Sequence, residues 1–417
     1  MSKPLSFFNL VFVFVYQISL AQNTPELINS GELIAQGAKL NDDGKYKEAI
    51  QLYSKISRSD TNYSAALHEL AFSCYVDSQI EASLNYARTG LKLFPEKSAE
   101  WYTLMGNAYD QGHQRNEAIR CYDSALKLRP YNYLTWFNKG IACYNINQYD
   151  EAKACLQRAV LINPYHSSSH YFLGAICVAQ GKIVPAMLSF TTCLLANPGS
   201  RYMNSATKYL SQLSKMTDDI TAKISNSVHT EGDNFELQQE IIVSEVALDK
   251  NYKLQTGIDD PITRQLQVLF EKLQFDAGDK GFWMQFYVPF YTNLFKKGQF
   301  DPFVNYIFSG LDIKAVKDYN RKNSKEVESF TSDAVDYLNA IRRTEAVNYA
   351  DRTPENYKYY YGSDNLLGIG KWTERGEDDD FYGPWEFFYD NGQLKSKGNF
   401  NNNGEREGEW VYYYANG

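Results

Sequence analysis

Residues 133–166 read YLTWFNKGIACYNINQYDEAKACLQRAVLINPYH, and this stretch is one unit of an internal repeat. It carries a small residue at Gly140, a second small residue at Ala152, and a closing proline at Pro164. Small residues let two helices approach closely, and a proline ends a helix because it lacks the backbone N–H. The unit is therefore predicted to be a pair of antiparallel helices.

The same pattern recurs along residues 30–200. The positions equivalent to Gly140 are Gly37, Ala71, Gly106 and Gly174, and those equivalent to Ala152 are Ala49, Ser83, Ala118 and Ala186. The predicted units are 30–63, 64–98, 99–132, 133–166 and 167–200. A single helix pair cannot bury its apolar face, so we expect the five units to stack around one continuous core. The fold class is therefore predicted to be mainly α.

The unit resembles the tetratricopeptide repeat. The residues that carry the resemblance are Trp136, Gly140, Tyr144, Ala152, Ala159 and Pro164. The first two units depart from the pattern, with Thr61 in place of the closing proline and Ala71 in place of glycine. The resemblance implies a right-handed α-solenoid whose concave face, lined by the first helix of each pair, holds a peptide or helix of a partner protein.

The register of the family places seven binding residues on that face. They are Phe72, Tyr75, Asn107, Phe137, Ile141, Tyr144 and Tyr171. The best-known ligand mode of the family uses lysine, asparagine and arginine to hold a carboxylate, but Ile34, Ala38 and Leu134 stand at three of those positions. We therefore expect an apolar, aromatic groove. The alternative is that the protein's own next segment covers some of these rings.

Beyond the repeats, a helix over 201–216 is predicted to cap the stack, and residues 217–350 form a helical segment of no recognised family. Asp260-Pro261 and Asp301-Pro302 each have the chemistry of a helix start. A long polar helix is expected over 313–343. The aromatic run 282–291 is interpreted as a small helical core, with an exposed docking surface as the alternative.

A second repeat begins at Gly383. Trp385, Tyr389 and Asn391-Gly392 recur 25 residues later, and their alternation predicts strands joined by an Asn-Gly hairpin turn. These residues resemble the bacterial variant of MORN repeats over 355–417, which implies a small antiparallel β-hairpin array. The chain ends at a turn, Asn416-Gly417. The array is interpreted either as cut short or as ending in an unpaired strand.

The N-terminus predicts export. Residues 1–21 combine a lysine, an apolar run and small residues before Gln22, as in a secretory signal peptide cleaved near Ala21. The protein is expected to be periplasmic, outer-membrane-associated or secreted. No other stretch is long and apolar enough to span a membrane, so no transmembrane segment is predicted in the mature chain.

Charge and residue chemistry argue against several classes of partner and cofactor. The net charge of −8 argues against nucleic acid as a partner. The six cysteines fall at repeat positions that bury modest side chains, so we expect free thiols rather than disulfides. His166 and His170 have the spacing of a metal pair but lack the glutamate of a zinc protease, so neither a metal nor any other cofactor is predicted.

These observations favour a scaffold of the cell envelope or secreted space that binds a partner protein or peptide and has no catalytic residues. Two alternatives stay open. The first is an enzyme with a site in 217–350, built on carboxylates such as Glu271, Asp276 and Asp279, with the repeats as recruitment modules. The second is an antitoxin-like role, which rests only on a role often assigned to the family that the hairpins resemble.

Overall fold

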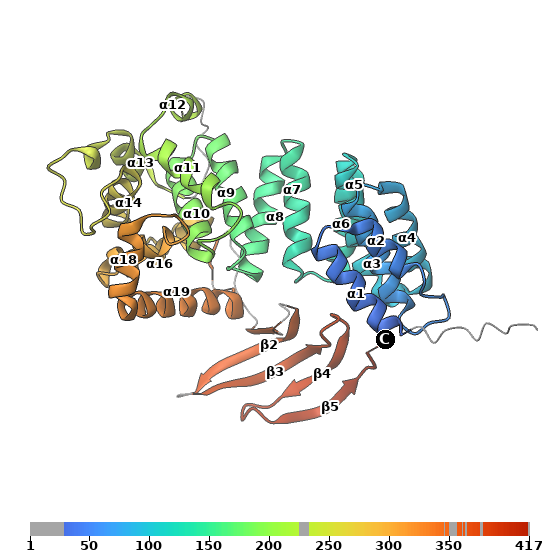
Figure 1. Ribbon diagram of the computed structural model, residues 1–417. Coiled ribbons are helices and arrows are strands. Elements are labelled where there is room, and N and C mark those ends of the chain that lie inside the picture. The colour runs from blue at the N-terminus through green and yellow to red at the C-terminus, as the bar shows by residue number, and fades with distance from the viewer. Residues whose placement is uncertain are drawn as a thin grey trace, which may run out of the picture.

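A helical body and a separate antiparallel sheet make up the protein (Figure 1). The computed structural model describes residues 29–224, 233–345, 347–349, 357–360, 362, 365–375 and 378–415. The predicted signal peptide and the turn at Asn416-Gly417 lie outside these residues. No helix in the described residues is long and apolar enough to cross a membrane.

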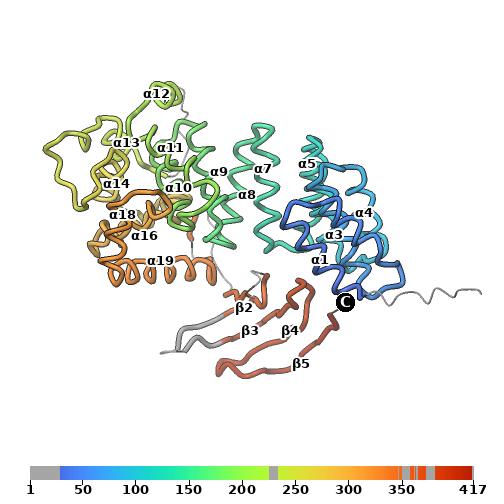
Figure 2. The backbone as a smooth tube through the Cα atoms, in the orientation of Figure 1, coloured from blue at the N-terminus to red at the C-terminus, as the bar shows by residue number. Residues whose placement is uncertain are grey.

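Five helix pairs occupy residues 30–196, one pair for each predicted unit. They are α1 (Ser30–Asp42) with α2 (Tyr46–Tyr53), α3 (Tyr63–Val76) with α4 (Ile80–Leu93), α5 (Ser98–Gln111) with α6 (Arg115–Leu128), α7 (Tyr133–Asn145) with α8 (Tyr149–Ile162), and α9 (Ser167–Ala179) with α10 (Ile183–Ala196). A short 3₁₀ helix, η1 (Pro95–Lys97), follows α4. Successive helices pack on one another along the chain (Figure 2).

The recurring glycines mark the closest approach of the two helices in a pair. A Cβ at Gly174 would lie 2.9 Å from the ring of Phe190, which stands on the partner helix and fills the space that the missing side chain leaves. The same complementarity joins Gly106 to Tyr122. In the second pair the small residue is alanine, and the large partner is replaced by alanine too: Ala71 and Ala87 share one core cluster. The pairing of a glycine with a large ring, seen at Gly106 and Gly174, is thus absent from the second pair, where Trp101 of the next pair belongs to the same cluster.

The helical stack continues past the fifth pair. Two further helices follow, α11 (Met203–Ser214) and α12 (Asp218–Ile224). The helix expected over 201–216 is therefore present as α11, but it does not end the stack, because the middle segment packs beyond it. The side-chain amide of Gln265 reaches the backbone oxygen of Ser214 at 3.3 Å.

The middle segment is helical. It consists of α13 (Glu236–Val243), η2 (Val246–Leu248), α14 (Pro261–Lys272), α15 (Phe282–Phe286), α16 (Val288–Lys296), α17 (Phe300–Ile307), α18 (Lys314–Lys322) and α19 (Ser324–Thr344). Its apolar residues belong to the same core cluster as those of α8, α9 and α10. It is a continuation of the solenoid core rather than a separate domain core.

The aromatic run 282–291 forms part of this shared core, so the interpretation as a core is confirmed. Trp283 and Tyr291 are almost completely buried. The indole N–H of Trp283 donates to Ser189 Oγ at 2.7 Å, and the Tyr291 hydroxyl lies 2.6 Å from Thr192 Oγ1. Both partners stand on α10, so these bonds satisfy buried polar groups across the boundary between the repeats and the middle segment.

Two expectations for the middle segment need correction. The long helix expected over 313–343 is broken into α18 and α19 at Asn323, whose side-chain amide donates back to the carbonyl of Tyr319. A polar side chain that bonds the preceding turn competes with the continuous helix. The second helix start, expected at Asp301-Pro302, lies earlier, because α17 begins at Phe300.

The C-terminal sheet is a five-stranded antiparallel meander in the order β1-β2-β3-β4-β5. Its strands are β1 (Tyr357–Tyr360), β2 (Leu366–Arg375), β3 (Asp378–Phe388), β4 (Leu394–Phe400) and β5 (Arg406–Tyr412). The predicted hairpin joins β3 to β4, but its turn is longer than the two-residue form. Tyr389 N–H donates to the Gln393 carbonyl at 2.8 Å, and of the residues between them Gly392 alone has a positive φ, 78°.

The aromatic rings of the sheet lie over glycines of neighbouring strands. Trp385 on β3 covers Gly370 on β2, and Trp410 on β5 covers Gly398 on β4. Any side chain at these glycines would occupy the place of the indole rings. The repeat of 25 residues also recurs in the backbone, because Gly383 and Gly408 have similar positive φ angles of 65° and 70°. Both positions therefore favour glycine.

A buried ion cluster joins the sheet to the helical body. Glu345, just past the end of α19, accepts from Arg158 of α8 at 2.6 Å and lies 2.6 Å from the ammonium of Lys358 on β1. Lys358 also lies 5.5 Å from the ring centre of Tyr131, in the loop before α7. Glu345 thus joins three parts of the molecule, and the sheet sits beside the loop ends of the helix pairs (Figure 1).

Candidate binding surface

The first helices of the five pairs pack side by side and share one surface, which we call the first-helix face. All seven residues predicted to bind a partner lie on these helices. Phe72 and Tyr75 belong to α3, Asn107 to α5, Phe137, Ile141 and Tyr144 to α7, and Tyr171 to α9. The face is not flat, because three hollows lie along it.

The middle hollow brings four of the seven residues together. Tyr75, Asn107, Phe137 and Ile141 line a cavity of about 140 Å³ between α3, α5 and α7. Phe137 is only 9% exposed, and its ring packs edge-on against His166 at 4.7 Å. Phe137 therefore forms the floor of the hollow, whereas Tyr75 and Ile141 are half-buried and offer apolar surface to a ligand.

Hydrogen bonds hold the side chain of Asn107, the polar one of the four predicted residues in this hollow. The side-chain oxygen of Asn107 accepts from the hydroxyl of Tyr122 and from the amide of Asn138, both at 2.9 Å. Because both bonds go to the side-chain oxygen, they fix the orientation of the Asn107 amide group. Asp110 also lines the hollow. Burial raises the pKa of its carboxyl, although the positive charge of Arg115 acts to lower it.

A second hollow of about 230 Å³ lies nearer the N-terminus and contains Phe72. Asn107 lines it as well, so the two hollows share a wall. Its polar lining is paired within the protein: Arg129 binds Glu100 at 3.1 Å, and the hydroxyls of Thr103 and Thr135 are 3.2 Å apart. This hollow offers an apolar ring beside groups that already have partners.

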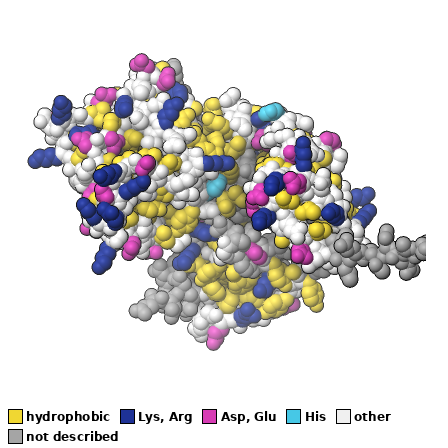
Figure 3. Space-filling view, in the orientation of Figure 1, with side chains coloured by type: hydrophobic (Ala, Val, Ile, Leu, Met, Phe, Trp, Pro, Cys, Tyr) yellow, Lys and Arg dark blue, Asp and Glu magenta, His cyan; other side chains and the backbone are white. Residues whose placement is uncertain are grey.

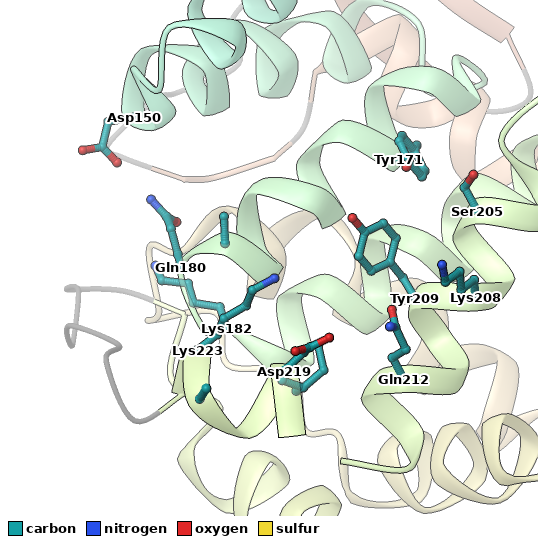
Figure 4. A pocket seen from close by; sticks show the side chains of 13 residues that line it. Asp150, Tyr171, Gln180, Lys182, Ser205, Lys208, Tyr209, Gln212, Asp219 and Lys223 are labelled. Carbon is teal, nitrogen blue, oxygen red and sulfur yellow. The ribbon is translucent and has the colours of Figure 1, made fainter. Parts of the chain in front are cut away.

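The third and largest hollow, about 1070 Å³, is open and is lined mainly by α9, α11 and α12 (Figure 4). Tyr171 is the one predicted residue in its lining. The other lining residues include three lysines, Lys182, Lys208 and Lys223, that the repeat pattern did not predict. Two of them belong to α11 and α12, which lie beyond the five predicted units, so the register of the repeat carried no signal for them.

The remaining predicted residues are covered by their own chain to different degrees. Tyr171 stacks on Tyr202, from the segment that follows the fifth pair, with ring centres 4.4 Å apart. Here the alternative, that the next segment covers the rings, is right. Tyr144 packs against Phe172 and Tyr149 and lines none of the three hollows. Hydrophobic side chains gather in a band over the α7–α9 region and again over the sheet (Figure 3).

The two histidines of the predicted metal-like spacing are structural. His170 Nε2 lies 2.9 Å from the Pro164 carbonyl, and His170 Nδ1 lies 2.8 Å from the Tyr287 hydroxyl, so both ring nitrogens have protein partners. Burial lowers the pKa of His166 and of His170 to about 4. No cluster of three or more metal-ligating side chains occurs among the residues that the structure describes.

All six cysteines are buried free thiols, as expected from their repeat positions. Burial raises the pKa of Cys193 to about 12. The comparison of equivalent positions in adjacent units missed one interaction inside the fourth pair, between Cys143 and Cys155. The neighbouring Cys155 thiol lowers the pKa of Cys143, and the Cys155 thiol itself donates to Glu151 Oε1 at 3.8 Å.

The carboxylates considered for an enzymatic site have structural partners. Asp279 accepts backbone N–H groups of Asp233, Asn234 and Gly281, and Glu271 accepts from the Tyr252 hydroxyl at 3.0 Å. Asp276 accepts from the backbone N–H of Gly278. None of the three lines any of the hollows described above.

Comparison with known families identifies the repeat. Residues 99–132 and 133–166 each match a tetratricopeptide repeat family. These are the third and fourth predicted units, in the predicted register. In the structure each matched segment is a helix pair, α5 with α6 and α7 with α8.

Similar proteins support the same class. The chain is 26% identical over 160 residues to a TPR repeat-containing protein of Methanocaldococcus jannaschii, a match that covers 36% of this chain and 28% of the relative. It is 25% identical over 150 residues to the mitochondrial import receptor subunit TOM70 of Rattus norvegicus, covering 36% and 24%. The matches thus span about a quarter of the relatives' own length.

Among solved structures, a thermophilic TPR protein of Thermus thermophilus covers 43% of this chain and 98% of its own, with 16% identity and a TM-score of 0.39. MamA of Desulfovibrio magneticus covers 42% of this chain and 99% of its own, with 16% identity and a TM-score of 0.35.

Proposed function

We propose that this protein is a non-catalytic binding scaffold whose first-helix face holds a segment of a partner protein. Tetratricopeptide proteins generally mediate contacts between proteins, which supports the proposal. The observation that carries it is the row of three hollows along one face, which contains six of the seven predicted residues. A row of hollows between parallel helices fits successive side chains of one extended or helical segment.

The proposal extends to the other parts of the chain. We propose that the C-terminal sheet is a MORN-like hairpin array, supported by the 25-residue recurrence of Gly383 and Trp385 and by the rings that cover glycines. We also propose export to the cell envelope or beyond, supported by the composition of residues 1–21. A mature protein whose first residue is not close to Gln22 would contradict a cleaved signal.

The test of the binding face begins with the partner. The tagged, mature protein is used to capture proteins from its own cell envelope, and the affinity of the captured partner is then measured by calorimetry. Replacing Phe72 and Tyr75 together by alanine removes two half-buried rings whose centres lie 5.9 Å apart. We expect the affinity to fall about tenfold or more, because truncating an anchor residue costs upward of about 1.4 kcal/mol.

Phe275→Ala is the matched control. Phe275 is 46% exposed in the loop after α14, outside the repeats, and lines none of the three hollows, so its replacement deletes a similar aromatic side chain away from the first-helix face. Circular dichroism establishes that each variant is folded. An affinity equal to that of the wild type in a folded Phe72→Ala, Tyr75→Ala protein would exclude this face as the binding site.

A further inference from the structure

The largest hollow gathers positive charge on an acidic protein. The chain as a whole carries a net charge of −8, yet Lys182, Lys208 and Lys223 all line this hollow. They come from three places in the fold: the turn before α10, α11 and α12. Their side chains surround one cavity (Figure 4). Tertiary packing alone brings them together.

The rest of the lining is rich in hydrogen-bond donors. Hydroxyl groups come from Tyr171, Tyr209 and Ser205, and amide groups from Gln180 and Gln212; Ala179, Ile220 and Ala222 add apolar surface. Two carboxylates, Asp150 and Asp219, also lie at the hollow, and both are exposed. Asp150 is bound to Lys153 at 3.1 Å, so its charge is already balanced by a further lysine.

Lys182 is half-buried, whereas Lys208 and Lys223 are exposed. Burial, and then the nearby charge of Lys153, lower the pKa of the Lys182 ammonium, while Asp233 and Asp150 act in the opposite direction. Burial is the largest cause, so the lowered pKa reflects the half-buried position of Lys182. An incoming carboxylate would stabilise the charged form of Lys182.

The position of the hollow decides which anion fits. It opens on the first-helix face and shares that face with the middle hollow, whose lining includes Phe172 and Tyr202. Both of these residues also pack against Tyr171 of the largest hollow. A cavity of about 1070 Å³ accommodates several residues rather than one ion. The chain's negative net charge disfavours a nucleic acid.

We propose that the partner segment bound on the first-helix face carries two or more Asp or Glu residues at the end that enters the hollow of Lys182, Lys208 and Lys223. This inference rests on the proposed function. It adds the chemistry and the direction of the bound segment: acidic residues lie at the α11–α12 end, and apolar residues lie toward Tyr75 and Ile141. Complementary charge at such a site gives orientation as well as affinity.

The test uses a displayed library of random 12-residue peptides against the full-length chain. We expect the selected peptides to be enriched in Asp and Glu and to bind more weakly as salt is raised. In the triple variant Lys182→Gln, Lys208→Gln and Lys223→Gln, the affinity of a synthetic selected peptide should fall about tenfold or more. The control variant, Lys314→Gln, Lys322→Gln and Lys325→Gln, changes the net charge equally at exposed positions of α18 and α19.

The outcomes separate this inference from the proposed function. If selected peptides lose affinity in Tyr75→Ala but show neither acidic enrichment nor sensitivity to the lysine variant, the acidic partner is excluded and the binding face stands. If the control variant weakens binding as much as the lysine variant, the effect is one of net charge and the inference is overturned. If no peptide is selected, or none responds to Tyr75→Ala, both proposals fail.

Discussion

At the scale of single residues, His170 shows how a repeated position acquires a second role. Trp136 occupies the same place one unit earlier, and its indole N–H donates to the Pro130 carbonyl at 2.8 Å. His170 Nε2 meets the Pro164 carbonyl in the same way. A carbonyl only accepts, so Nε2 carries the proton, and Nδ1 of the neutral ring accepts from the Tyr287 hydroxyl. His170 therefore links the repeats to the middle segment in its uncharged form.

Stability should consequently depend on pH through this ring. Burial lowers the pKa of His170 from 6.5 to about 4, so between these values the unfolded chain binds the proton that the folded chain excludes. The contribution of the neutral His170 ring to the free energy of unfolding is fully present above pH 6.5 and is lost as the pH falls toward 4. We expect the difference in the free energy of unfolding between the wild type and His170→Gln to shrink by on the order of 3 kcal/mol from pH 7 to pH 4.

Urea denaturation at several pH values measures this difference. Comparing the two proteins at each pH removes the contributions of other groups. Asp233 is one of them: burial raises its pKa to about 6, so its contribution is lost in the opposite direction, as the pH rises from 3.8 to 6. A difference between wild type and variant that stays constant over pH 7 to 4 would show that His170 is not buried in the neutral form.

At the scale of elements, the start of α14 is encoded locally. The side-chain oxygen of Asp260 accepts from the backbone N–H of Ile262 at 2.8 Å and of Thr263 at 3.2 Å, and Pro261 occupies the first helical position. This is the arrangement predicted from Asp260-Pro261. The same dipeptide chemistry failed at Asp301-Pro302, because packing of Phe300 in the core extends α17 toward the N-terminus.

We expect Asp260→Ala to lower the free energy of unfolding by about 1 kcal/mol, the usual cost of losing an N-cap. The neighbouring Asp259→Ala serves as the control, because Asp259 is exposed and its carboxylate binds the side chain of Arg264 rather than a helix N-terminus. Chemical denaturation followed by far-ultraviolet circular dichroism compares the two. Equal losses in the two variants would indicate that Asp260 acts through charge rather than as a cap.

At the scale of the whole molecule, the sheet is held in place by Glu345. Arg158 and Lys358 contact its two oxygens, and the side chains of the three residues are 16%, 4% and 11% exposed for Arg158, Lys358 and Glu345. Burial by itself would raise the pKa of Glu345, but the charges of Lys358 and Arg158 hold it below 4.5. The contact is therefore complete above pH 4.5 and is lost as the pH falls through the lowered pKa.

Glu345→Gln should loosen the sheet from the helical body, because it leaves two buried cations without their shared carboxylate. Breaking a buried ion pair in this way costs on the order of 3 kcal/mol. We expect faster amide hydrogen exchange in β1 and β2 with little change in α9 and α10. Glu328→Gln, at an exposed position of the same helix α19, is the control. Unchanged exchange in β1 would mean that the docking of the sheet rests on other contacts.

Local sequence pattern is enough to predict the features that repeat. The five helix pairs, their helix-to-helix contacts at Gly106 and Gly174, the burial of the cysteines and the β3–β4 hairpin all follow from it. Each depends on residues within one unit, so the same physical constraint returns at a fixed interval and becomes visible as a period. Five of the seven predicted residues also line the middle or N-terminal hollow, because register alone places them on the first helices.

How the parts meet is set by long-range packing, which no local pattern encodes. His170 and Tyr287 are 117 residues apart, and Arg158 and Glu345 are 187 apart. The packing of the middle segment on α9 and α10, the docking of the sheet and the gathering of Lys182, Lys208 and Lys223 each occur once. A contact that occurs once, between distant residues, leaves no periodic trace in the chain, because it depends on how complete surfaces fit together.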